Sequence, residues 1–146
     1  MPKHFTPEEN ARWMASRPRK VLDVKLIIRA RSGGVLLVKP AYKPTWQLPG
    51  GGVDAHESPV ATALRELREE TGLVGELSKL RLIDTVFRKE PDHVFLMYEY
   101  DEILADDIKI IPSDPEVEGH KFVAPSDVPS LIPSYYAEFW HDYVAR

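Results

Sequence analysis

Apolar and polar positions follow two different periods along the chain, and each period predicts a different kind of element. Runs rich in branched residues, bounded by Gly, Pro and charged turns, are typical of strands. A Ser-Gly-Gly turn separates the first two runs and predicts a hairpin. The strand candidates are residues 21–30 and 35–40, two runs within 79–103 that meet at a turn at 90–92, and the short runs 108–112 and 120–125.

The helical period is clearest in the middle of the chain, after a loop at 41–58 that is rich in Pro and Gly. Ser58 and Pro59 suit the N-cap and the first position of a helix, and Gly72 suits its C-terminal stop. The apolar residues between these signals fall at i, i+3, i+4 and i+7, which predicts one buried stripe. The stripe consists of Val60, Ala63, Leu64 and Leu67.

Two further helices are expected near the ends of the chain. Thr6, Pro7 and Glu9 form a capping-box pattern, which predicts an N-terminal helix over about 6–16. An amphipathic aromatic pattern predicts a C-terminal helix over about 134–145. Its aromatic side chains serve either packing or the surface of a homodimer, and the pattern leaves both alternatives open.

These elements predict an α/β fold, with a mixed sheet covered by helices, in a single domain over residues 1–146. The formal net charge of -4 argues against a nucleic-acid polymer as the main partner. The absence of cysteine excludes disulfides and thiolate metal sites, and fits a cytoplasmic protein. No apolar run has the length needed to cross a bilayer, so we expect no membrane partner.

Three glutamates of the central helix, Glu66, Glu69 and Glu70, lie at i, i+3 and i+4 and therefore crowd onto one face. Like charges at this spacing repel each other and destabilise an isolated helix. Glu57 lies just before the helix, and the glycines at 50–52 let the backbone approach a ligand closely. Such an oxygen-rich site suits Mg²⁺ or Mn²⁺, and a bound cation would turn the repulsion into attraction.

The chemistry that this site favours is attack of water on a phosphoanhydride. Mg²⁺ held by few carboxylates completes its coordination with waters and substrate phosphates. A nearby carboxylate would then take the proton of the attacking water as general base. Taken alone, the three glutamates also fit a solvated acidic helix face, and Glu57 with Arg65 fits a simple surface ion pair.

The segment that contains these residues resembles the Nudix family. Residues 51–73 read GGVDAHESPVATALRELREETGL, and the preceding WQLPGG resembles the usual run-in to the Nudix box. The box is Gly-x5-Glu-x7-Arg-Glu-U-x-Glu-Glu-x-Gly-U, with U apolar, and every specified position matches. The matching residues are Gly51, Glu57, Arg65, Glu66, Leu67, Glu69, Glu70, Gly72 and Leu73.

This resemblance implies a Nudix hydrolase with an α/β/α sandwich that cleaves a nucleoside diphosphate linked to another moiety, using Mg²⁺ or Mn²⁺. It also implies roles for single residues. The implied metal ligands are Glu66, Glu69, Glu70 and the Gly51 carbonyl, with Glu57 pairing with Arg65 and also contacting metal. The implied general base is Glu66, Glu69 or, in a later loop, Glu116, with Glu118 as the fallback.

Residues outside the box are candidates for binding the substrate. Lys39 and Lys43 lie near the glycine loop and are candidates for binding phosphates as point charges. Trp46 is a candidate for stacking on a base or sugar. For the lysines the alternative is an ordinary surface position, and for the tryptophan it is the core.

The sequence therefore predicts metal-dependent hydrolysis of a small nucleotide-type substrate, such as a nucleoside triphosphate, ADP-ribose or a nucleotide sugar. The first alternative is a Nudix module that senses a nucleotide without cleaving it, and the complete box argues against that loss of function. A diphosphate isomerase on the same scaffold is a second alternative, and the absence of cysteine argues against it. A purely structural protein fits the metal constellation least.

Overall fold

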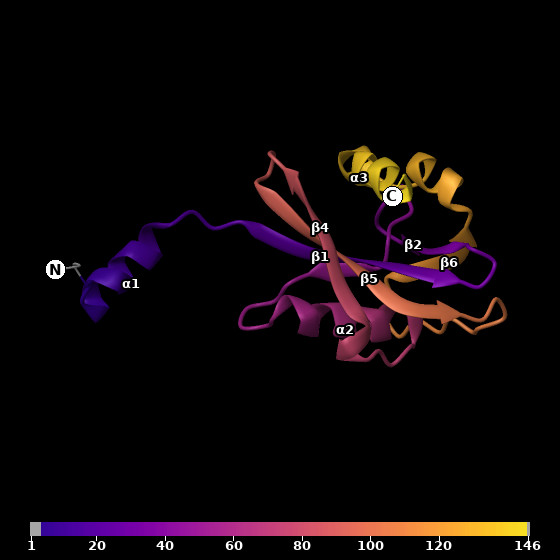
Figure 1. The fold of residues 1–146 in the computed structure, drawn as a ribbon, viewed down its shortest axis with the longest axis horizontal. Coiled ribbons are helices and arrows are strands. Elements are labelled where there is room, and N and C mark those ends of the chain that lie inside the picture. Colours follow the sequence, from indigo (N-terminus) through magenta and orange to yellow (C-terminus); the bar gives the residue numbers. More distant parts are fainter. Residues whose placement is uncertain (1–3, 146) are drawn as a thin grey trace.

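The computed structural model describes residues 4–145 as a sheet with one helix on each face and a further helix standing apart (Figure 1). Residues 1–3 and 146 of the predicted domain lie outside the described residues. The helices and strands are α1 (Pro7–Ser16), β1 (Val21–Ala30), β2 (Val35–Pro40), β3 (Gly50–Gly52), α2 (Pro59–Thr71), η1 (Leu77–Lys79), β4 (Leu80–Arg88), β5 (His93–Leu104), β6 (Val117–Val123), η2 (Pro125–Ser130) and α3 (Ser134–Val144).

The sheet has the strand order β4-β5-β1-β2-β6, and β3 pairs with β1 beside this path. β1 runs parallel to β5, while the other pairs are antiparallel, so the predicted mixed sheet is confirmed. β3 covers only residues 23–25 of β1, and β2 pairs with the far end of β1 at Arg29. The glycines of β3 therefore lie against the beginning of the central strand.

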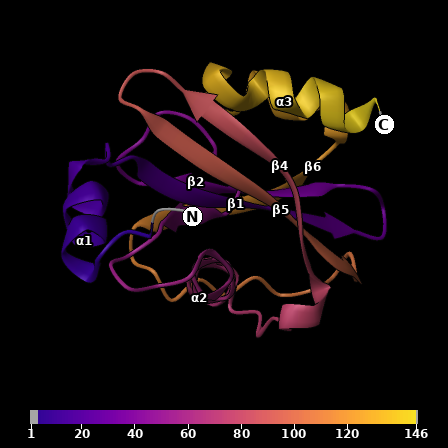
Figure 2. The same cartoon turned by 60° about the vertical axis from the view of Figure 1, so that its left-hand side comes forward.

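The two faces of the sheet carry different helices, with α2 under one face and α3 over the other (Figures 1 and 2). Alternation along β1 divides the two cores, because successive side chains of a strand point to opposite faces. Val24, Leu26 and Ile28 join the core around α2, whereas Ile27 joins the core around α3. The predicted α/β/α sandwich is thus the observed architecture.

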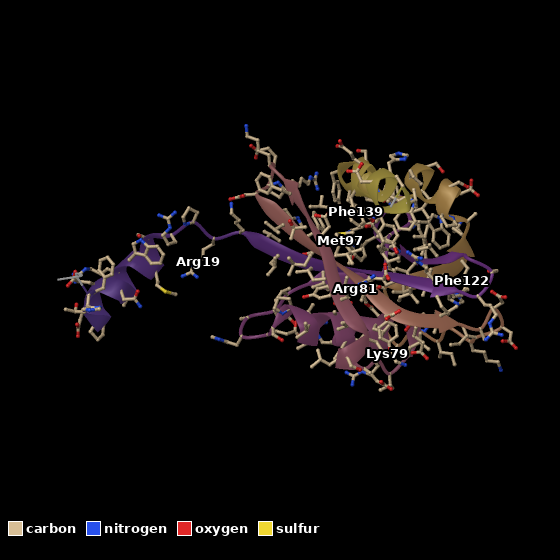
Figure 3. All side chains as sticks on the ribbon, in the orientation of Figure 1. Arg19, Lys79, Arg81, Met97, Phe122 and Phe139 are labelled. Atoms are coloured by element: carbon tan, nitrogen blue, oxygen red, sulfur yellow. The ribbon has the colours of Figure 1, made fainter. Side chains whose placement is uncertain are left out.

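The aromatic residues of α3 pack against the sheet. Tyr136 and Trp140 are fully buried, and Figure 3 places Phe139 and Met97 in the layer between α3 and the sheet. Two polar atoms of α3 in this layer have partners, since Trp140 Nε1 donates to the Pro125 carbonyl at 2.7 Å and the Tyr136 hydroxyl donates to Gln47 Oε1 at 3.0 Å. These contacts favour packing over a homodimer surface as the role of the aromatic residues.

The N-terminal helix α1 stands away from the sheet at the end of an extended connection that includes Arg19 (Figures 1 and 3). Thr6 is its N-cap, and its Oγ1 accepts a hydrogen bond from the Glu9 N–H at 3.1 Å, as the capping-box pattern predicts. None of its residues is buried. This helix therefore contributes nothing to the core.

One strand prediction is wrong, because residues 108–112 form a loop. Ile110 is buried without belonging to a strand, and the Ile111 N–H donates to the Thr71 carbonyl at the end of α2 (2.9 Å). The apolar pattern of this segment thus reflects packing against α2. The other short candidate, 120–125, overlaps β6, which begins three residues earlier than predicted and ends at Val123, two residues before the predicted end.

No helix within residues 4–145 is both long enough and apolar enough to span a membrane.

Candidate active site

Local sequence determines where α2 begins and ends, and hence which of its residues face the sheet. Ser58 is the N-cap, and its Oγ accepts a hydrogen bond from the Ala61 N–H at 3.2 Å. Gly72 has a φ of +79°, a left-handed conformation that favours glycine and ends the helix. In this register Ala63 and Leu67 are fully buried. The acidic residues of the helix lie beside this stripe.

The Arg65 guanidinium group donates hydrogen bonds to carboxylates of α2 and of the loop before it. Its Nε and Nη2 donate to the two oxygens of Glu57 at 2.8 and 3.0 Å. Its Nη1 donates to Glu66 Oε1 at 2.9 Å and to Glu69 Oε2 at 3.2 Å, and Nη2 also reaches the Gly52 carbonyl at 3.2 Å. The pairing of Arg65 with Glu57 is therefore present, and its hydrogen bonds lower the pKa of Glu57 to about 2.

Glu66 and Glu70 are buried carboxylates, each 8% exposed. The Gly50 N–H donates to Glu70 Oε2 at 3.0 Å. Burial, and after it the negative charge of Glu66, raise the pKa of Glu70 to about 8. Burial likewise raises the pKa of Glu66. Two such groups side by side are unfavourable as anions until a cation neutralises them.

The bare backbone of β3 fits closely against these carboxylates. A Cβ added at Gly51 would collide with Glu66 Oε1, and one added at Gly50 would collide with the Val24 carbonyl oxygen. Gly50 also has a φ of +154°, which side-chain-bearing residues rarely adopt. Glycine is therefore required at position 50, where the obstacle is the backbone of β1, whereas a side chain at position 51 would displace the Glu66 carboxylate.

The chemistry of the donor set fits a hard divalent cation. Glu66, Glu69 and Glu70 offer carboxylate oxygens, and Gly51 offers a carbonyl, which are the ligands that Mg²⁺ and Mn²⁺ prefer. Among residues 4–145, however, no three acidic or histidine side chains already converge as a metal site. Instead, Arg65 bonds to two of the carboxylates that metal would need. The individual ligands therefore stay a prediction.

A cavity of about 120 Å³ lies beside this acidic face, with walls from β1, β2, β3, α2 and the loop before β3. Lys43 lies in its wall, with Nζ 5.6 Å from the ring centroid of Tyr42. The lining residues are Asp23, Lys25, Val38, Pro40, Tyr42, Lys43, Gln47, Leu48, Gly50, Gly51, Gly52 and Glu70. A larger cavity of about 380 Å³, between the β1–β2 hairpin and α3, contains none of the predicted site residues.

The other two candidates for substrate binding lie outside the lining of this cavity. Lys39 Nζ donates to the carbonyls of Pro40 (2.8 Å) and Lys43 and forms an ion pair with Glu118 at 3.2 Å. Trp46 is half-buried against the core, and its ring lies 4.2 Å from Lys121 Nζ. Lys39 is therefore engaged within the protein, and the contacts of Trp46 agree with the core alternative.

Glu116 lies in the loop before β6, which is attached to the end of α2. The N–H groups of Ser113 and Asp114 donate to the Glu69 carbonyl at 2.9 and 3.1 Å. The Glu116 carbonyl accepts from the Ala41 N–H at 2.7 Å, which ties the loop to the wall of the cavity. Its side chain is exposed. The structure thus places Glu116 close to the rim, while its role as a base stays a prediction.

Sequence reasoning missed three polar residues that line the cavity: Asp23, Lys25 and Gln47. The first two lie in the run that was interpreted simply as an apolar strand. Their spacing contained a signal, because two charged residues at i and i+2 of a central strand point to the same face. Gln47 had no comparable signal, since a single polar residue in a loop is ordinary.

Known proteins resemble this chain over most of its length. A family model described as NUDIX domain matches residues 19–143. A proposed 8-oxo-dGTP diphosphatase of Bacillus subtilis strain 168 is 34% identical over 109 residues, which are 73% of this chain and 68% of that protein. An RNA pyrophosphohydrolase of Halorhodospira halophila is 45% identical over 51 residues, but these are only 35% of this chain and 28% of that protein.

Solved structures share the same fold at lower identity. The MutT protein from Methanosarcina mazei Go1 superposes with a TM-score of 0.69 at 23% identity, covering 88% of this chain and 97% of that one. The NUDIX domain of NrtR from Shewanella oneidensis, complexed with ADP-ribose, gives a TM-score of 0.66 at 22% identity, covering 88% and 79%. At these identities the likeness concerns the fold alone.

Proposed function

Because the chain belongs to the Nudix family, we propose that it hydrolyses a phosphoanhydride bond in a nucleoside diphosphate linked to another moiety. One observation carries this proposal. The buried carboxylates of Glu66 and Glu70 lie beside the glycine strand β3, and Glu70 also lines a cavity that holds cationic side chains. Such an arrangement is unfavourable in an empty site and becomes favourable when cation and phosphates are bound.

Glu66, Glu69, Glu70 and the Gly51 carbonyl would hold Mg²⁺ or Mn²⁺, with Glu57 as a further candidate ligand. When bound, such a cation polarises a phosphoryl oxygen and lowers the pKa of a coordinated water. The choice of cation follows from the all-oxygen donor set, in which no thiolate competes, since the chain lacks cysteine.

The residues of the chain then have two roles, which are positioning and proton transfer. Arg65 fixes the orientation of Glu57, Glu66 and Glu69 through its hydrogen bonds. One carboxylate, Glu66, Glu69 or Glu116, takes the proton of the attacking water. The water oxygen forms a bond to one phosphorus, and the bridging P–O bond breaks. The bridging oxygen leaves with the other phosphorus, so two phosphate-bearing fragments are released, one of them a phosphate ester or a nucleoside monophosphate.

The substrate class rests on the names of relatives and on the size of the cavity. The Bacillus subtilis relative is named for a deoxynucleoside triphosphate, and the Shewanella oneidensis domain binds ADP-ribose. A cavity of about 120 Å³ holds a base edge or a phosphate rather than a whole nucleotide. We therefore propose a small nucleotide whose remaining parts lie in solvent or against the rim. We also propose a cytoplasmic place of action, which the absence of cysteine fits.

The test is a panel of nucleoside triphosphates, ADP-ribose and nucleotide sugars incubated with Mg²⁺, with the products identified by mass spectrometry. Reaction in ¹⁸O-labelled water shows which phosphorus the water attacks. Glu69→Gln and Glu70→Gln should abolish turnover in this panel. Glu138→Gln, on the exposed side of α3, is their matched control. Binding of panel members without any turnover would overturn the proposal and favour the non-catalytic sensor.

A further inference from the structure

Lys25 is a buried cation that the proposed mechanism does not use. It lies on β1 and is 4% exposed, although it lines the cavity beside the glutamates. Within the described part of the chain its ammonium makes one hydrogen bond, to Gln47 Oε1 at a long 3.5 Å. An ammonium has three donors. A buried lysine with this little pairing is costly, and burial lowers its pKa.

The position of this ammonium is fixed by its surroundings. Gln47 Oε1 also accepts a hydrogen bond from the buried Tyr136 hydroxyl at 3.0 Å, and Gln47 Nε2 donates to Thr45 Oγ1 at 2.9 Å. Lys25 Nζ lies 5.8 Å from the ring centroid of Tyr136. A donor held in this way loses little entropy when a ligand binds to it.

Asp23 supplies an acceptor next to this donor. The two residues are i and i+2 on β1 and so share a face of the strand, and both line the cavity. Asp23 Oδ1 lies 3.1 Å from His93 Nε2 without forming a hydrogen bond to it, so the carboxylate can still accept from a ligand. On the neighbouring strand, residues 50–52 pair with residues 23–25 and carry no side chains. The cavity is therefore continuous between Glu70 and the Asp23–Lys25 pair.

We propose that Asp23 and Lys25, supported by Gln47, form the subsite that selects the substrate by its base, with Lys25 donating to a carbonyl oxygen and Asp23 accepting from an adjacent N–H. This inference rests on the proposed function for the identity of the substrate as a nucleotide. Guanine and thymine carry such an edge, whereas adenine has no carbonyl. Lysine pairs with guanine O6 and carboxylates accept from base N–H groups elsewhere in nucleic-acid recognition.

A phosphate is the other oxygen-rich part of a nucleotide, and the charges argue against it here. A phosphate has acceptors only, so it would leave Asp23 facing a like charge. Lys43, which also lines the cavity, and the carboxylates proposed to bind the metal suit the phosphates better. A second possibility, that Lys25 only balances the charge of Glu70, predicts no effect on base selection.

The experiment measures binding by titration calorimetry with non-hydrolysable analogues of GTP, dTTP and ATP, and with inorganic triphosphate. Wild-type protein is expected to bind the GTP and dTTP analogues more tightly than the ATP analogue. Lys25→Met keeps the length of the side chain and removes the donor. It is expected to weaken the favoured analogues about tenfold to a hundredfold and to leave the ATP analogue and triphosphate nearly unchanged. Lys109→Met, at an exposed loop position, is the matched control.

Asp23→Asn gives a second reading that does not require Lys25→Met to fold, because it keeps the shape of the side chain and changes only its acceptor pattern. It is expected to reduce the same preference. Equal weakening of all analogues and of triphosphate would overturn the inference, since it would make Lys25 a phosphate ligand. An unchanged preference in both variants would overturn it in favour of charge balance. Absence of any turnover would refute the proposed hydrolysis, while these binding constants would still decide base selection.

Discussion

Helices α2 and α3 cover opposite faces of one sheet with opposite chemistry. α3 buries four aromatic side chains, and its buried Trp140 and Tyr136 each have a hydrogen-bond partner. α2 buries Ala63 and Leu67, but also Glu66 and Glu70, whose ionisation burial opposes. One face therefore stabilises the fold, while the other contains buried carboxylates whose charge lowers its stability until a proton or a cation neutralises them.

The largest expected effect concerns activity and comes from the α2 face. Glu70→Gln and Glu69→Gln each replace a carboxylate oxygen of the proposed metal site, so turnover should fall by orders of magnitude while the fold persists. Steady-state kinetics on the best panel substrate, with circular dichroism for the fold, provides the measurement. Near wild-type rates in both variants, with Glu138→Gln unchanged, would refute the assignment of this face.

The α3 face should respond in the opposite way, through stability. Trp140→Ala removes a fully buried indole and its hydrogen bond to Pro125, and should lower the free energy of unfolding by about 3–5 kcal/mol. Denaturant unfolding measures this loss. Trp13→Ala on the separate helix α1 is the control, because its side chain is exposed and its loss should cost less than about 0.5 kcal/mol. Similar losses in both variants would contradict the packing described.

A smaller effect concerns the pH dependence of the metal-free protein. The pKa of Glu70 is raised from 4.5 to about 8, so between these values the folded state binds a proton that the unfolded chain has lost. The melting temperature of chelator-treated protein should therefore fall by several degrees as pH rises from about 5 to 8. Glu70→Gln should flatten this dependence.

Added Mg²⁺ should raise the melting temperature, most strongly near pH 8, because a ligand that binds only the folded state stabilises it. A melting temperature indifferent to millimolar metal would count against the cation site.

Glu57 should affect stability at acidic pH. Its pKa of about 2 means that its contribution to stability is present above pH 4.5 and disappears as pH falls toward 2.

The smallest effect concerns how the two helices begin. The Ser58 side chain caps α2, whereas α3 begins without a side-chain cap. Ser58→Ala should therefore cost about 1 kcal/mol, and Ser134→Ala at the start of α3 should cost almost nothing. Chemical denaturation of both variants checks the difference. Equal losses of unfolding free energy in the two variants would show that the Ser58 cap does not stabilise the start of α2.

Elements with local signals could be predicted from sequence alone. Ser58 and Gly72 end α2 through a hydrogen bond and a backbone angle that involve only neighbouring residues. Residues close in sequence therefore suffice to predict both ends. The segment 108–112 has the same kind of apolar pattern as a strand, yet Ile110 reaches the core from a loop. Period alone does not say whether an apolar segment pairs with a strand or packs against a helix.

The family and the acidic face of α2 could be predicted from one short segment with fixed spacing, and the family resemblance implied the pairing of Glu57 with Arg65. Only the tertiary structure brought Asp23, Lys25 and Gln47 to the wall that Glu70 also lines. The physical reason is distance along the chain, since the hydrogen bond between Tyr136 and Gln47 joins residues 89 positions apart. The burial that raises the pKa of Glu70 and lowers that of Lys25 likewise exists only once the sheet and its helices have packed.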